Sequence, residues 1–228
     1  MGARSFAALA RDMRDLAKVV TFVALIASTH DARADEWDGC RSNEPDRVIA
    51  SCTKVIETPG IDPDHLAEAL LRRGIGYDHL SQFQRAIGEY DEVIRILPQS
   101  NTKYRAIAHN NRAGAYLELG KPSQGLPDSE KAVQLIPKQP HFWAVRGWIN
   151  QSLGDRQGAI RDHDAAMALG GARWLKHYQC GLRLARLYLG PLDGVLRPEL
   201  RAALLTCVDK GHSCAPWSTD PECPDPVG

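Results

Sequence analysis

The feature that most constrains the fold is a pattern that recurs in three consecutive stretches, residues 67–100, 106–139 and 140–173. Small and aromatic residues occupy the positions that a helix–turn–helix repeat of about 34 residues requires. A small residue on each helix lets two backbones approach closely, and aromatic side chains fill the space beside them. The first stretch fits best, with Leu70, Gly74, Tyr77, Ala86, Tyr90 and Pro98. The pattern predicts an all-α fold of stacked helical hairpins, because a single hairpin would leave an apolar stripe uncovered.

The other two stretches keep this register with substitutions. The second has Tyr116, Gly120, Ala132 and Pro137, with Ala113 and Gly125 as small substitutes; the third has Trp143, Gly147, Gly154, Ala159 and Ala166 and departs at Asn150, His163 and Gly171. A five-residue insertion, residues 101–105, should lengthen the connection or the following helix. Over residues 67–173 the pattern resembles that of the tetratricopeptide repeat family. The resemblance implies a solenoid of three helical hairpins, followed here by a small helical C-terminal module.

The resemblance also implies a binding surface, since in this family the first helix of each hairpin lines a concave groove. The candidate groove residues carried over from the family are Arg72, Ile75, Asn110, Asn111 and Trp148. We expect Trp148, with Arg72 and Asn111 nearby, to bind a protein or peptide, because tryptophan and arginine contribute much of the binding energy at interfaces. The alternative is that Trp148 packs between hairpins.

Some members of the family hold the C-terminal carboxylates of chaperones with lysine, asparagine and arginine at fixed groove positions. In this chain only Asn111 fits that arrangement. The other four positions hold Leu71, Ile75, His141 and Val145. We therefore do not expect a carboxylate clamp.

Residues 1–34 have the pattern of a signal peptide. Basic residues precede the apolar run 19–27, and Ala32-Arg33-Ala34 forms a small-x-small cleavage site. Cleavage before Asp35 would leave no membrane span, although an uncleaved anchor is the alternative reading. The sequence predicts a bacterial periplasmic or secreted protein.

Residues 35–66 are predicted to form an N-terminal capping half-repeat, because residues 46–57 have the pattern of one amphipathic helix. All six cysteines follow the export signal, and an even number in that context favours disulfides. Cys40 and Cys52 bracket the turn into the predicted helix and are the expected pair. The remaining cysteines have three possible pairings; they are Cys180, Cys207, Cys214 and Cys223.

Residues 174–210 resemble the small three-helix peptidoglycan-binding module of bacterial envelope proteins. The residues that carry this resemblance are Gln179, Leu182, the turn Gly190-Pro191-Leu192-Asp193-Gly194 and Arg201-Ala202-Ala203-Leu204. The resemblance implies that Asp193 and Gly194 contact a glycan. Arg197, Leu200 and Cys207 depart from the family pattern, and the alternative is a helical cap on the last hairpin. Residues 211–228 are expected to form an irregular tail rich in cysteine and proline.

Composition and motifs disfavour several functions. Lysine plus arginine and aspartate plus glutamate each number 28, so no net charge favours nucleic acid. Asp162-His163-Asp164 is the one segment with a metal-site composition, but neighbouring helix residues diverge, and we expect a solvated helix face. The sequence has no phosphate-binding loop or nucleophile motif. We predict no catalytic residues, no metal site and no cofactor, and therefore no enzyme.

Three functions follow from these patterns. The leading one is an exported adaptor whose groove binds a protein or peptide. The alternative is a cell-wall-associated protein that binds peptidoglycan through residues 174–210. A third class, an envelope hydrolase or its regulatory subunit, would require a convergent cluster of titrating groups in the groove.

Overall fold

The structure, a computed structural model, describes residues 35–211 of the 228-residue chain. A helical stretch at residues 35–40 comes first, and no strand occurs within the described range. The helices that follow are α2 (Pro45–Ile56), α3 (Pro63–His79), α4 (Phe83–Ile96), α5 (Thr102–Glu118), α6 (Pro122–Leu135), α7 (Pro140–Ser152), α8 (Arg156–Leu184) and α9 (Pro198–Asp209). The predicted all-α class is confirmed.

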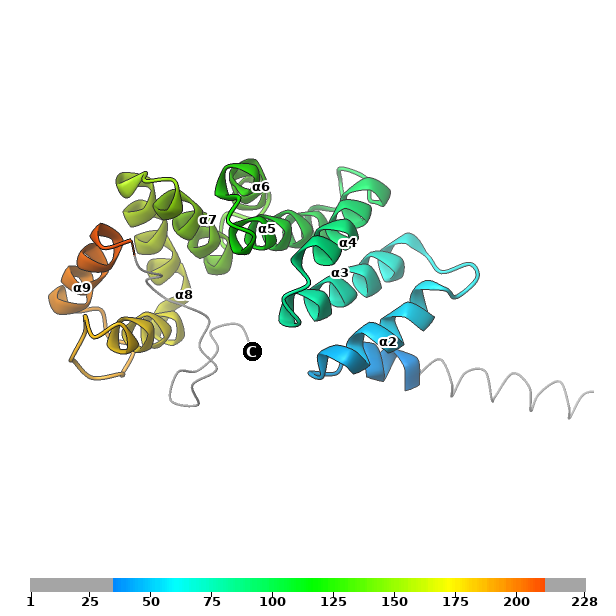
Figure 1. Cartoon of the computed structure of the whole chain (residues 1–228), viewed down its shortest axis with the longest axis horizontal. Coiled ribbons are helices and arrows are strands. Elements are labelled where there is room, and N and C mark those ends of the chain that lie inside the picture. Colours follow the sequence, from blue (N-terminus) through cyan, green and yellow to red (C-terminus); the bar gives the residue numbers. More distant parts are fainter. Residues whose placement is uncertain (1–34, 212–228) are drawn as a thin grey trace, which may run out of the picture.

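Consecutive helices pack against one another along the whole described chain. The first hairpin is α3 with α4, the second is α5 with α6, and the third is α7 with the first part of α8. Figure 1 shows the helices following one another in an arc from α2 to α9, with α3 and α5 on its inner side. This is the predicted helical-hairpin solenoid, and we call the inner surface of α3 and α5 the concave face.

Short-range signals explain where the helices begin and end. Five helices have proline in their first turn, where the missing amide N–H would have no helical partner. Gly120 and Gly154, with φ of 68° and 81°, form the turns after α5 and α7. The insertion at residues 101–105 lengthens α5, which begins at Thr102. Arg105 on the added turn donates to the carbonyls of Ile94 and Leu97 at the end of α4, at 2.6 and 3.1 Å.

The two helices of each hairpin approach most closely at the predicted small residues. A Cβ atom added to Gly74 would lie 2.6 Å from the Tyr90 ring, and one added to Gly147 would lie 2.9 Å from the His163 ring. In the second hairpin, a Cβ atom on Gly125 would lie 2.8 Å from the Ala113 carbonyl oxygen. These glycines are therefore required by packing, as their positions in the repeat predict.

The N-terminal segment covers the first hairpin and carries the predicted disulfide. Helix α2 packs on α3. Cys40 and Cys52 form a disulfide with their Cα atoms 4.7 Å apart, and both cysteines are fully buried. The bridge therefore joins the stretch before α2 to the middle of that helix.

The C-terminal segment continues the array as a further pair of helices. Helix α8 is interrupted at Gly171, whose φ of 61° and ψ of −153° are not helical. The second part of α8 packs with α9, and their buried apolar residues belong to the same core as the third hairpin. Arg201 on α9 also pairs with Asp164 at 2.8 Å. This packing is what the cap alternative predicts.

Two sequence predictions concern residues at the ends of the chain. The signal peptide and the tail from residue 212 lie outside the described residues, as do Cys214 and Cys223. Cys180 and Cys207 are both disulfide-bonded. None of the helices within residues 35–211 combines the length and the apolar character needed to cross a bilayer.

Replacing both Cys40 and Cys52 by serine should lower the free energy of unfolding by about 3 kcal/mol, because the bridge closes a short loop in the unfolded chain. Urea denaturation of the chain from Asp35 onward measures the change. A loss below about 0.5 kcal/mol, the range of a neutral surface substitution, would mean that packing alone holds the segment.

Candidate functional site

Three of the five predicted groove residues are accessible on the concave face. Arg72 is half-buried and its Nε donates to Glu68 at 2.9 Å, within the same helix. Ile75, with 37% of its surface exposed, lies one turn further along α3. Asn111 on α5 is partly exposed. These three residues offer a guanidinium, an aliphatic side chain and an amide to a partner, and whether they bind one remains a prediction.

The other two predicted groove residues are buried. Asn110 is 1% exposed and Trp148 is 8% exposed. Trp148 belongs to the core formed by the third hairpin and the C-terminal helices, and its ring centroid lies 6.3 Å from that of His163. This burial matches the alternative in which Trp148 packs between hairpins.

A polar cluster between the first two hairpins involves a carboxyl, Asp78, that the sequence pattern did not single out. Tyr90 on α4 donates its hydroxyl to Oδ2 of Asp78 on α3, at 2.5 Å. Asn111 on α5 lies against the same hydroxyl, and Asn110 donates to Asn111 at 3.2 Å. We call Asp78, Tyr90, Asn110 and Asn111 the Asp78 cluster. It joins three helices at the contact between the first and second hairpins.

The environment of Asp78 favours its neutral form. Burial raises the pKa of Asp78 to about 7, and the negative charge of Glu118 on α5 adds to the rise, while the hydrogen bond from Tyr90 opposes it. A carboxyl that titrates near neutral pH is unusual and marks a candidate functional position.

Sequence reasoning missed a polar pair that recurs in every hairpin. An arginine at the seventh position of each repeat donates two hydrogen bonds to a carboxylate sixteen residues later. The N···O distances lie between 2.6 and 3.1 Å. These arginine–carboxylate pairs are Arg73–Glu89, Arg112–Asp128 and Arg146–Asp162. Each joins the first helix of a hairpin to the second. The recurrence of an arginine followed sixteen residues later by an acidic residue was a signal available in the sequence.

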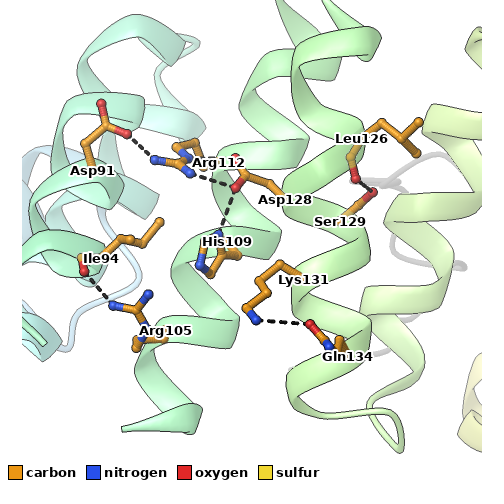
Figure 2. A network of polar contacts seen from close by, with 10 residues as sticks. All are labelled: Asp91, Ile94, Arg105, His109, Arg112, Leu126, Asp128, Ser129, Lys131 and Gln134. Atoms are coloured by element: carbon orange, nitrogen blue, oxygen red, sulfur yellow. Dashed lines mark hydrogen bonds and ion pairs between the residues drawn. The ribbon is translucent and has the colours of Figure 1, made fainter. Parts of the chain in front are cut away.

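Figure 2 shows the second of these pairs, in which Arg112 reaches both Asp128 on α6 and Asp91 on α4. Nδ1 of His109 lies 2.8 Å from Asp128. Burial works to raise the pKa of Asp128, but the hydrogen bonds from His109 and Arg112 outweigh it and hold this pKa below its ordinary value. Asp128 is therefore ionised at neutral pH, and three consecutive helices meet at one ion network.

The prediction of a solvated face at Asp162-His163-Asp164 is wrong for two of the three residues. Asp162 is 1% exposed and His163 is fully buried. Asp162 accepts hydrogen bonds from Arg146 and, at 2.9 Å, from Asn150. His163 lies 2.8 Å from the Tyr178 hydroxyl, and burial lowers its pKa to about 3. Asp162 joins α8 to α7 within the third hairpin, and His163 contacts a residue beyond the kink of α8 at Gly171. An argument from one straight helical segment includes neither set of partners.

The predicted glycan contacts, Asp193 and Gly194, are engaged in a turn of the C-terminal segment. The buried Gln179 side chain accepts from the Gly194 amide at 2.9 Å and donates to Asp193 at 3.2 Å. Arg197 also pairs with Asp193, at 2.7 Å. Gly194 has a φ of 74°, and a Cβ atom there would lie 2.4 Å from the Ala172 carbonyl oxygen. The hydrogen bonds and close packing within the turn explain why these residue types occur there, without a glycan ligand.

Two solved structures resemble this architecture. A MamA double mutant has a TM-score of 0.52 at 18% sequence identity, covering 78% of this chain and 91% of its own. MamA from residue 41 onward, from Desulfovibrio magneticus RS-1, has a TM-score of 0.51 at 18% identity, covering 68% of this chain and 82% of its own. These likenesses concern the fold. No protein-family model matches the chain.

Relatives in sequence include the mitochondrial import receptor subunit TOM70 of Homo sapiens, 29% identical over 124 residues, or 54% of this chain. Hsp70-Hsp90 organizing protein 3 of Arabidopsis thaliana is 29% identical over 132 residues, or 58% of this chain. These relatives and MamA are tetratricopeptide-repeat proteins. Together with the helical-hairpin fold, these relatives support the tetratricopeptide-repeat family for this chain. It spans only 20% of the length of each of these two relatives.

The tetratricopeptide array gives little basis for catalysis. Within residues 35–211, no group of three histidine, cysteine, aspartate or glutamate side chains is placed to hold a metal ion. The Asp78 cluster has one carboxyl with a raised pKa, next to a tyrosine whose pKa is itself raised by burial and by Asp78. The relatives named above are a receptor subunit and an organizing protein, and neither name is that of an enzyme.

Replacing Arg146 by methionine should lower the free energy of unfolding of the array by about 3–5 kcal/mol, because it leaves the Asp162 carboxylate buried without its cation. The control is Arg95→Met, which breaks an exposed pair with Glu92 and should cost at most about 1 kcal/mol. Urea denaturation compares them. Equal losses would show that the buried pair has no special role.

Asp78→Asn should change how the stability of the array depends on pH. The folded pKa of Asp78 is raised, so its contribution to stability is full below the unfolded pKa and is lost as the pH rises through about 7. The variant should therefore gain stability relative to the wild type between pH 5 and pH 8, by at most about 3 kcal/mol, because the pKa of about 7 lies about two pH units above the start of this range. The contribution of His163 to the pH dependence is the same in both proteins, so it cancels from the difference between their free energies of unfolding. A difference that does not vary with pH would contradict the raised pKa.

Proposed function

We propose that the chain is an exported scaffold whose concave face binds an extended segment of a partner protein. The observation that carries the proposal is the exposure of Arg72, Ile75 and Asn111 on α3 and α5, the two helices that lie on the inner side of the arc (Figure 1). An array of stacked hairpins forms an extended inner surface of this kind, which can hold several consecutive residues of a partner.

The names of the relatives support a protein partner. One is an import receptor subunit and another is an organizing protein for Hsp70 and Hsp90. The concave face of this chain differs from a carboxylate clamp, because Asn111 is the one clamp position retained and Ile75 replaces a polar one. The proposed partner is therefore an internal protein segment rather than a chaperone C-terminus.

Export to the periplasm or the cell exterior is supported by two features. Residues 1–34 have the order of a signal peptide, and the first described cysteines form a buried disulfide. Disulfides persist in oxidising compartments and are rare in the cytosol. The alternative function, binding of peptidoglycan, gains no support from the turn at Asp193 and Gly194, which is occupied by its own hydrogen bonds.

The experiment begins with the chain expressed from its own N-terminus in a bacterial host. The mass of the protein recovered from the periplasm should correspond to a start at Asp35; recovery of the uncleaved chain from the cytosol would reject export. The purified protein is then used to select binders from a displayed library of random twelve-residue peptides.

We expect the wild type to enrich peptides whose affinity falls at least about tenfold, or about 1.4 kcal/mol, in the variant Ile75→Glu. The matched control is Leu153→Glu, in the turn after α7, because Leu153 is a similarly exposed apolar residue, at 42% against 37% for Ile75. The control should bind like the wild type. Equal binding by all three proteins would place the peptides elsewhere, and the absence of enriched peptides would reject the scaffold function.

A further inference from the structure

The Asp78 cluster contains hydrogen-bond acceptors that the described part of the chain does not satisfy. Oδ1 of Asp78 and Oδ1 of Asn110 are both buried and have no hydrogen-bond partner among residues 35–211. Asn110 is itself 1% exposed, and its amide lies beside Asn111 on the concave face. A buried acceptor without a partner destabilises the protein by about 1–3 kcal/mol. The cluster therefore has unused capacity to accept hydrogen bonds.

The charge around the cluster is also unbalanced. Arg72, Arg73 and Arg112, the nearest arginines of α3 and α5, are already paired with other carboxylates. Asp78 and the exposed Glu118 form no ion pair among the described residues, and the two carboxyls act on each other unfavourably. A cationic hydrogen-bond donor would relieve both the missing hydrogen bonds and the repulsion.

The shape of the neighbouring surface fits a long cationic side chain. Ile75 and Asp78 are three residues apart on α3 and so share one helix face. Lysine and arginine combine an aliphatic stem with a charged end, and such stems pack along apolar surface. Asp78 is partly exposed and its Oδ2 accepts from Tyr90, so Oδ1 is the oxygen left to accept a hydrogen bond from a bound group.

We propose that Asp78, with Asn111 and Glu118 beside it, forms a subsite that selects a lysine or arginine side chain in the bound segment. Ile75 contacts the stem of that side chain, and Tyr90 holds the Asp78 carboxyl in place. The inference rests on the proposed function, since it specifies the chemistry of the segment that the concave face binds. The raised pKa of Asp78 is consistent with a carboxyl that has no cation nearby in the free protein.

The test uses the same selection of random twelve-residue peptides. The enriched peptides should share a lysine or arginine at one position, and replacing it by norleucine should weaken binding to the wild type about tenfold. The variant Asp78→Asn should bind the lysine and norleucine peptides within about twofold of each other. Glu118→Gln should partly reduce the difference in affinity between the lysine and norleucine peptides. Thermal melting of each variant checks that it is folded.

The matched control is Glu130→Gln, which removes one exposed carboxylate on α6, outside the concave face. Glu130→Gln should keep the full preference for the lysine peptide over the norleucine peptide. If it loses this preference as fully as Asp78→Asn does, the preference comes from the overall negative charge of the protein, and the subsite is overturned. Enriched peptides without a shared basic residue would overturn the subsite and leave the scaffold function standing. No enrichment by the wild type would overturn both.

Discussion

The buried arginine–carboxylate pair sets the geometry of every hairpin in this array. Each arginine directly precedes the small residue at which the two helices approach most closely, as in Arg73-Gly74 and Arg146-Gly147. Ions placed there lose hydration, and such pairs are stable only when the hydrogen-bond geometry is good. Both oxygens of each carboxylate are engaged, which fixes the level at which one helix lies beside the other. The pair thus gives the hairpin its register, while apolar burial gives it most of its stability.

This arrangement also determines what remains for binding. The arginines of these pairs, Arg73, Arg112 and Arg146, are held by the second helix of their hairpin and cannot serve a ligand on the concave face. The polar groups left there are amides and carboxyls, notably Asn111, Asp78 and Glu118, with Arg72, whose charge is paired with Glu68 on the same helix. A face of this composition differs from the basic groove that a carboxylate clamp requires, although both are built from the same repeat. The internal ion pairs therefore influence specificity without contacting a ligand.

Much of the fold was predictable, because the residues that define the repeat act locally. Packing within one hairpin requires the residue types at Gly74 and Tyr90, and at Ala113 and Gly125. Their spacing in the sequence therefore predicts the hairpin directly. The burial of Trp148 could not be decided from the repeat, since the core to which it belongs includes residues after 171, which lie outside the pattern. Asp162 and His163 were misjudged for a related reason, because their partners lie on α7 and beyond the kink in α8 at Gly171. The polar contacts of the candidate site likewise depend on pairs of hairpins rather than on one.

The interruption at Gly171 shows how differently this array tolerates changes in length along the chain. Between the first and second hairpins, five extra residues are absorbed by lengthening α5, which begins at Thr102, and Arg105 on the added turn bonds to the end of α4. At Gly171 a single residue, in a backbone conformation reserved for glycine, joins two helices with no connecting loop. The direction of the last two helices is thus encoded in one pair of dihedral angles. A residue added at Gly171 would change the direction of the last two helices relative to the preceding hairpins. The same addition before α5 would leave the curvature of the array unchanged.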